Sequence, residues 1–204
     1  MHRSCVRCWQ RMARTGQECC TPDRGTGEDR RRVARDVRVT PARPATTVSG
    51  MDVSVWNRDQ AVAAARRVVE DNDYLTLATA GAEGTPWATP VWFAADGLAQ
   101  FFWVSRMTRR HSHNIEERPE VALAIFDSTT PVGEAEAVYV QALAGQVDDA
   151  ELGAALAVFA GKSMARGIRV WDEADVTGDA PHRLYVARAT EVFVLDPNEQ
   201  RVRI

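Results

Sequence analysis

The stretch that decides the fold spans residues 74–105 and reads YLTLATAGAEGTPWATPVWFAADGLAQFFWVS. Three runs rich in aromatic, β-branched and other apolar residues lie within it, at 74–79, 87–94 and 98–105. A segment containing Gly and Pro separates the first two runs, and an Asp-Gly turn separates the last two. Because such segments favour tight turns, the stretch predicts three consecutive antiparallel strands that form a meander.

Two helices are predicted from the spacing of a capping box, Asn57 with Gln60 and Asp148 with Glu151. The first helix should end near Asn72. The second should bury one apolar face, made by Leu152, Leu156 and Phe159.

Three further apolar segments predict strands, at residues 121–127, 138–147 and 183–195, and a short helix is expected between residues 106 and 119. The first segment is too apolar for an exposed sheet face, so this strand should be central. With the meander these make six antiparallel strands, and closing such a sheet removes its exposed edges. The predicted fold class is mainly β (α+β), a six-stranded antiparallel barrel with a few short flanking helices.

Composition and charge limit the partners. The 204 residues are 45% hydrophobic and 26% charged, which is typical of one globular domain with an appendage. No apolar run approaches the ~20 residues that a membrane-spanning helix needs, so no membrane partner is expected. Residues 1–50 hold 11 Arg and 5 acidic residues, a net charge of +6, whereas residues 51–204 hold 14 basic and 23 acidic residues, a net charge of −9. The acidic domain disfavours nucleic-acid binding.

The first fifty residues differ in character from the rest. They hold all four cysteines, but the adjacent pair Cys19-Cys20 matches the spacing of a zinc site poorly. Residues 21–50 lack hydrophobic periodicity. We therefore expect residues 1–50 to be a disordered extension, or to precede the true translation start, and residues 51–204 to form the domain. No signal-peptide core is present in the segment, so the expected location is cytoplasmic.

Candidate chemistry is concentrated in residues 105–115, SRMTRRHSHNI, where a strand is expected to end and a helix to begin. The first turn of a helix exposes unpaired N–H groups and a partial positive charge, which suit a phosphate. Arg adds a bidentate fork, and Ser112 adds another hydrogen bond. From spacing alone, a solvated basic turn fits equally well. His111 and His113 point to different sides of a helix, so no metal site is predicted.

Four short motifs follow one another in a fixed order. They are the strand Leu75-Thr76-Leu77-Ala78-Thr79, then Gly84-Thr85-Pro86 leading to Thr89-Pro90-Val91-Trp92-Phe93, then His111-Ser112-His113-Asn114-Ile115, and finally Arg118-Pro119-Glu120-Val121-Ala122. In this order and spacing, residues 74–147, and more loosely the chain up to residue 196, resemble the pyridoxamine 5'-phosphate oxidase-like FMN-binding split-barrel family. The resemblance implies a split β-barrel.

The resemblance also implies a homodimer with two FMN sites at the subunit interface. In such a site residues 89–92 line the flavin, Trp103 and Ser105 lie near the ribityl chain and phosphate, and Arg110 with His111 match the Arg-Lys pair that binds the phosphate. Plain core packing is an equal alternative for Trp92 and Trp103. The implied cofactor-binding residues are Thr89, Pro90, Val91, Trp92, Trp103, Ser105, Arg110, His111, Ser112 and Asn114.

The function implied by the resemblance is that of an FMN-dependent oxidoreductase acting on a small molecule. The family's Arg-Leu-His-x-Arg-type substrate segment has no counterpart in residues 196–204, so pyridoxamine-phosphate oxidase activity itself is not expected. One alternative is an oxidoreductase that uses the deazaflavin F420, whose acidic tail Arg106, Arg109 and Arg110 would hold. Others are a non-catalytic flavin-binding or sensing module and a metal-thiolate regulator acting through residues 1–50. No residue stands out as a catalytic acid or base.

Overall fold

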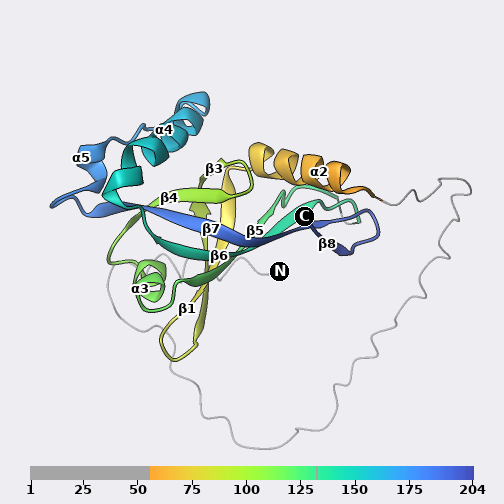
Figure 1. Ribbon diagram of the computed structural model, residues 1–204, viewed down its shortest axis with the longest axis horizontal. Coiled ribbons are helices and arrows are strands. Elements are labelled where there is room, and N and C mark those ends of the chain that lie inside the picture. Colours follow the sequence, from red (N-terminus) through yellow and green to blue (C-terminus); the bar gives the residue numbers. More distant parts are fainter. Residues whose placement is uncertain (1–55, 132) are drawn as a thin grey trace, which may run out of the picture. The chain divides into compact units, whose positions relative to one another are not determined.

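The computed structural model describes residues 56–131 and 133–204, so the predictions made for residues 1–50 lie outside the described part of the chain (Figure 1). Helix α2 (Arg58–Asp71) begins at the predicted capping box. The Asn57 side chain accepts a hydrogen bond from the Gln60 N–H at 2.9 Å, and the Gln60 side chain accepts one from the Asn57 N–H at 3.0 Å. Small and branched residues make the buried face of α2: Ala61, Ala64, Ala65, Val68 and Val69.

The described residues form one antiparallel sheet of eight strands in the order β2-β1-β5-β6-β7-β4-β3, with β8 paired to β7. The six longer strands correspond to the six predicted ones, and β5 is interior, as expected. Strands β3 and β8 have three residues each and were not predicted as separate strands. The bounds are β1 (Tyr74–Ala80), β2 (Pro86–Trp92), β3 (Ala94–Asp96), β4 (Gln100–Arg106), β5 (Glu120–Phe126), β6 (Ala137–Gln146), β7 (His182–Leu195) and β8 (Arg201–Arg203).

The sheet closes on itself at the junction of β2 and β3. These strands stand at opposite ends of the strand order, yet only Phe93 separates them in sequence. Strand β2 pairs with β1, whereas β3 pairs with β4. The predicted meander is therefore wrong at its second step, because β4 pairs along its whole length with β7. Phe93, the residue at which the chain passes from one end of the strand order to the other, is fully buried in the core.

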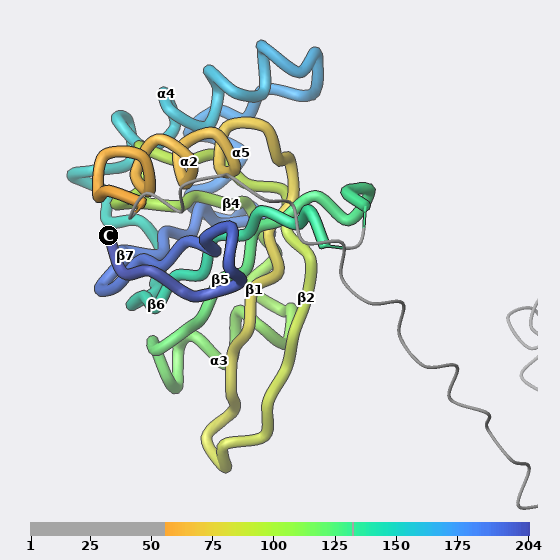
Figure 2. The backbone as a smooth tube through the Cα atoms, turned by 90° about the vertical axis from the view of Figure 1, so that its right-hand side faces the viewer, coloured from red at the N-terminus to blue at the C-terminus, as the bar shows by residue number. Residues whose placement is uncertain are grey.

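Three helices follow the first strands: α3 (Arg110–Glu117), α4 (Asp149–Ala165) and the short α5 (Glu173–Val176). Figures 1 and 2 both show α2 and α4 on one side of the barrel and α3 on the other. Helix α4 starts after Asp148, as predicted, but the Asp148 side chain makes no capping hydrogen bond, so the predicted capping box does not form. Helix α5 was not predicted.

Alternation along β4 divides the apolar core into two clusters. Phe101 and Trp103 belong to the cluster inside the barrel, together with Tyr185 of β7. Phe102, between them, belongs to the cluster under α4, which includes Phe159. In the second cluster, α4 packs on the outer face of β4 and β7. The partly buried Trp92, at the end of β2, packs against this cluster.

The predicted fold class is confirmed: the described residues form a mainly β, antiparallel barrel with a few helices attached. The predicted apolar face of α4 is also buried, at Leu152, Leu156 and Phe159. No helix within the described residues is long and apolar enough to cross a membrane.

Candidate functional site

An open pocket of about 630 Å³ lies where β2, β4, the start of α3 and the end of α4 meet. We call it the cofactor pocket, after the residues that the sequence predicts to bind a cofactor. Of the ten cofactor-binding residues predicted from the sequence, the structure brings five together in its lining: Pro90, Val91, Trp92, Ser105 and His111.

One side of the cofactor pocket is apolar and aromatic. Trp92 meets Phe159 of α4 edge to face, with ring centroids 5.0 Å apart and an interplanar angle of 82°. Ile168 and Trp171, from the segment after α4, extend this wall. Three consecutive residues of β2, Pro90, Val91 and Trp92, line the pocket, and none of them is fully buried. These aromatic and aliphatic side chains offer apolar contacts for a planar ligand.

A polar part of the lining lies at the N-terminus of α3. The Ser105 hydroxyl and the His111 Nε2 atom are 2.7 Å apart, in a buried hydrogen bond that joins the end of β4 to the first turn of the helix. Arg109 occupies the N-cap position, makes no capping hydrogen bond through its side chain, and lines the pocket. The first N–H groups of α3 have no partner within the helix, so they are available to an anion.

Burial and a neighbouring charge keep His111 neutral. The pKa of His111 lies below its usual value of 6.5, first because the ring is buried and second because the Arg109 guanidinium repels a second positive charge. At pH 7 the ring is therefore a neutral imidazole, which can donate from only one of its nitrogens. The polar end of the pocket thus combines the permanently charged Arg109 with His111, which becomes a cation when a bound anion raises its pKa.

Four of the other predicted residues lie behind or beside the cofactor pocket. Trp103 has no exposed surface and stacks on Tyr185 inside the barrel, with ring centroids 5.8 Å apart. Ser112 is fully buried and donates a hydrogen bond to the Arg106 carbonyl at 2.9 Å. The buried Asn114 side chain donates to the Thr79 hydroxyl at 2.8 Å, which ties α3 to β1. In this structure these three residues support the site and do not line it, and Thr89, half-buried on β2, is also outside the lining.

Arg110, the fifth of these residues, points elsewhere. Its guanidinium lies 4.6 Å from the centre of the Trp87 ring on β2, outside the residues that line the pocket. Arg109, its neighbour, is the arginine that lines the pocket. The predicted phosphate segment contributes Arg109 and His111 to the pocket lining, whereas the predicted Arg110 lies outside it.

The sequence reasoning missed the wall contributed by α4 and the segment after it. Arg166, just beyond the helix, donates from Nε to the Asp73 carboxylate at 2.7 Å, and both residues line the pocket. Tyr74 lines it as well. No motif marks these residues, because they are about ninety positions apart in sequence and meet only when α4 packs on the barrel.

Comparison with known proteins places the fold in a family. A sequence model described as pyridoxamine 5'-phosphate oxidase matches residues 61–196, two thirds of the chain. The chain belongs to the pyridoxamine 5'-phosphate oxidase family. The predicted family is thereby confirmed. No curated protein sequence matches the chain.

Several solved structures share the fold of this family member at low sequence identity. A heme binding protein from Mycobacterium smegmatis superposes with a TM-score of 0.58 and 21% identity, over 70% of this chain and 57% of that one, so the chain spans little more than half of that protein. HutZ, a heme storage protein from Vibrio cholerae, gives 0.50 and 19%, over 63% and 89%. General Stress Protein 26 from Bacillus anthracis gives 0.51 and 14%, over 70% and 98%. These likenesses establish the fold alone.

Proposed function

We propose that this family member is a flavin-dependent oxidoreductase that binds FMN in the cofactor pocket. The observation that carries the proposal is the division of one pocket into an aromatic wall and an anion-binding end. A flavin nucleotide has the same division, with a flat ring system at one end and a phosphate at the other. The volume of about 630 Å³ lies within the range of cofactor sites.

The residues at the polar end fit the phosphate. Arg109 supplies a charged fork, and the first N–H groups of α3 point toward an anion at the helix N-terminus. Ser105 and His111, joined by their hydrogen bond, add donors at the same end. A phosphate dianion there favours the imidazolium form of His111, which turns a neutral donor into a second cation.

The residues at the apolar end fit the ring. When bound, the flavin would supply the redox chemistry by accepting a hydride at a ring nitrogen. Trp92 and Phe159 would hold the ring and, with Trp171, exclude water from one of its faces. The chain's own contribution is therefore binding, orientation and desolvation, and we assign no catalytic acid or base.

We further propose that the domain is a homodimer. The outward face of β1, β5, β6 and β7 carries a largely apolar hollow of about 380 Å³. Half of its ten lining residues are small or aromatic, namely Ala78, Ala122, Ala124, Tyr139 and Phe193, and its polar members are Thr76, Gln141 and Arg201. Exposed apolar surface of this kind marks association sites on proteins. A second copy covering this face would bury it and would extend the walls of the open cofactor pocket.

The test is the identity of the small molecule that the full chain carries. We would express it in a host that makes both FMN and F420, denature the purified protein, and record the visible spectrum and mass of what is released. Release of FMN supports the proposal. Release of F420 would move the function to deazaflavin hydride transfer. A Soret band would indicate heme, because two of the structural relatives are a heme binding protein and a heme storage protein. If nothing is released and FMN does not rebind, the domain is not a flavoprotein.

A further inference from the structure

A second pocket, of about 380 Å³, lies beside the cofactor pocket, and we propose that it binds a small organic anion through carboxylate or phosphate groups. We call it the anion pocket. It is formed by α2, by β3 with the turn that follows, and by α4. Three of its four charged lining residues are cations, Arg66, Lys162 and Arg166, and the fourth is Glu70. The rest of the lining is alanine, valine and glycine, which leaves room for a ligand between the charges.

Lys162 is the central cation of this pocket. It is the only lysine among the 25 Lys and Arg residues of the chain. Its side chain is only 17% exposed. The ammonium lies 4.1 Å from the centre of the Phe93 ring and donates a hydrogen bond to the Asn72 carbonyl at 2.6 Å. An ammonium held in this way, largely out of water, gains more from a counter-anion than an exposed lysine does.

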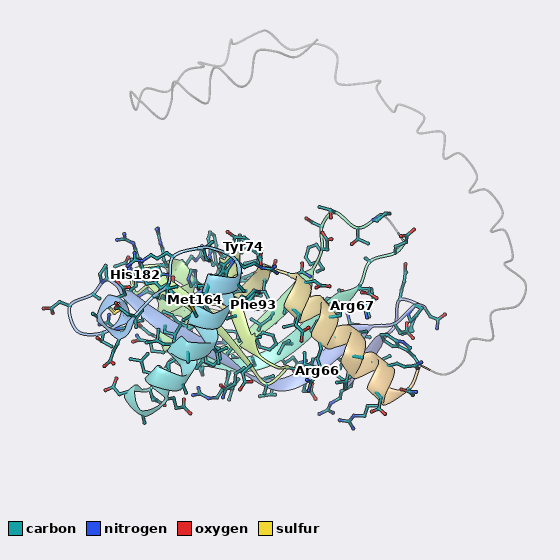
Figure 3. All side chains as sticks on the ribbon, turned by 90° about the horizontal axis from the view of Figure 1, so that it is seen from above. Arg66, Arg67, Tyr74, Phe93, Met164 and His182 are labelled. Carbon is teal, nitrogen blue, oxygen red and sulfur yellow. The ribbon has the colours of Figure 1, made fainter. Side chains whose placement is uncertain are left out.

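The charges around Lys162 do not cancel. Asp73 is shared, because it lies 2.7 Å from Arg166 and 3.8 Å from Lys162. Glu70 offsets one more cation, which leaves the group with a net charge of +1. Among the described residues Arg66 makes no ion pair, whereas its neighbour Arg67 binds Glu136 at 2.6 Å. Figure 3 shows Arg66 and Arg67 on different sides of α2. Arg66 is therefore the free guanidinium that a ligand anion would engage.

Burial also lowers the pKa of Lys162 to about 8, an effect opposed by Asp73 and reinforced by Arg166. A bound oxyanion would stabilise the charged amine and raise this pKa again. Arg66 and Lys162 are outside the cofactor pocket's lining, although the Lys162 ammonium lies 5.5 Å from the centre of the Trp92 ring, which belongs to that lining. Arg166 lines both pockets, so we leave it unchanged in the test.

The single lysine makes a direct test practical. We would label the full-length protein with the N-hydroxysuccinimide ester of acetic acid, a neutral amine reagent, and follow the peptide containing Lys162 by mass spectrometry. Inorganic phosphate and succinate are titrated separately, with sodium chloride at matched ionic strength. Phosphate and succinate represent the two kinds of anionic group that we propose. For each anion, the concentration that halves the labelling rate of Lys162, its half-protecting concentration, shows whether the pocket prefers phosphate or carboxylate. Protection of Lys162 by either anion, with the N-terminal amine unaffected, is the expected result.

Three variants decide whether the protection arises in the anion pocket. Arg66→Leu should raise the half-protecting concentration about tenfold, the usual effect of losing one charge-assisted contact. Arg67→Leu, the adjacent arginine on the same helix, should leave it unchanged. Glu70→Gln should lower it, because a repelling carboxylate is removed. Labelling of Lys162 that neither anion slows, or protection that survives in Arg66→Leu and does not improve in Glu70→Gln, would overturn the proposal.

Discussion

At the scale of single residues, the site depends on a buried pair formed by Ser105 and His111. The two residues are six positions apart, and the turn between β4 and α3 brings their side chains within 2.7 Å. Burial and Arg109 lower the pKa of His111, so the ring is uncharged near pH 7. The proposed phosphate would reverse this balance, because a dianion stabilises the protonated ring more than the neutral one.

This linkage predicts a pH dependence of cofactor binding. Because the pKa of His111 is low in the free protein and higher in the complex, binding takes up a proton between those two values. FMN affinity should therefore rise as the pH falls through this window, and His111→Gln should remove the rise. Isothermal titration calorimetry in buffers of different ionisation enthalpy measures the proton uptake. Subtracting the variant's profile removes the titration of the phosphate itself, and an identical profile in both proteins would exclude His111 from the phosphate site.

Arg109 and Arg110 provide a second prediction at this scale. Arg109 lines the cofactor pocket, and Arg110 rests on the Trp87 ring. Arg109→Ala should weaken FMN binding by about 1.5–3 kcal/mol, the usual contribution of a hydrogen bond to a charged group. Arg110→Ala should cost less, because its contact with Trp87 is partly exposed to water. Equilibrium titration of both variants ranks them, and the reverse order would show that Arg110 leaves Trp87 when the cofactor binds.

These residues also show how far sequence reasoning reached at the site. The cluster of cations at residues 106–111 and the helix that follows were visible in the sequence, so the polar end of the pocket could be predicted. Whether Arg109 or Arg110 faces the pocket depends on the residue at which α3 begins. Asn114 and Ser112 of this helix bind Thr79 of β1 and the Arg106 carbonyl, and these contacts exist only in the folded chain.

At the scale of elements, α4 acts as one wall of the cofactor pocket. Its position depends on the cluster under it, where Phe159 is 2% exposed and meets Trp92 edge to face. The helix and its apolar face were predicted from periodicity. The surface that α4 covers could not be predicted, because an amphipathic pattern shows which side of a helix is buried but not which element it packs against.

Removing the Phe159 ring should therefore loosen both the fold and the pocket. Phe159→Ala should lower the free energy of unfolding by about 3–5 kcal/mol, as is usual when a buried aromatic ring is replaced by alanine. Met164→Ala on the same helix, where the side chain is 64% exposed, should change it by less than about 0.5 kcal/mol. Urea unfolding followed by circular dichroism compares the two. Equal losses in both variants would mean that α4 is not anchored through Phe159.

At the scale of the whole molecule, the crossing from β2 to β3 at Phe93 closes the barrel. Strands β1, β5, β6 and β7 of the barrel together line the apolar hollow on their outward face. Parts of that face lie far apart in sequence, so no single segment reveals it. The proposed homodimer therefore rests on a surface that only the assembled sheet presents.

A charge placed on this face should separate the proposed dimer. Ala124, half-exposed in the middle of β5, lines the hollow, so Ala124→Arg would force an unpaired charge into a buried interface. The variant should be monomeric by light scattering coupled to size-exclusion chromatography and should bind FMN less tightly. Glu134→Arg, on the exposed loop before β6, is the matched control and should leave the dimer intact. A monomeric unmodified chain would overturn the proposed assembly.

The sequence by itself determined the longer elements, their order and the family, because helix caps, turn residues and hydrophobic periodicity are local properties that the chain carries before it folds. It also located the cationic segment before α3. The tertiary structure alone decided that β4 pairs with β7 and not with β2, that α4 closes one side of the pocket, and that Arg66, Lys162 and Arg166 converge. The physical reason is the same in each case: these contacts join segments separated by many residues, and they form only when closure of the barrel and burial of its two clusters bring those segments together.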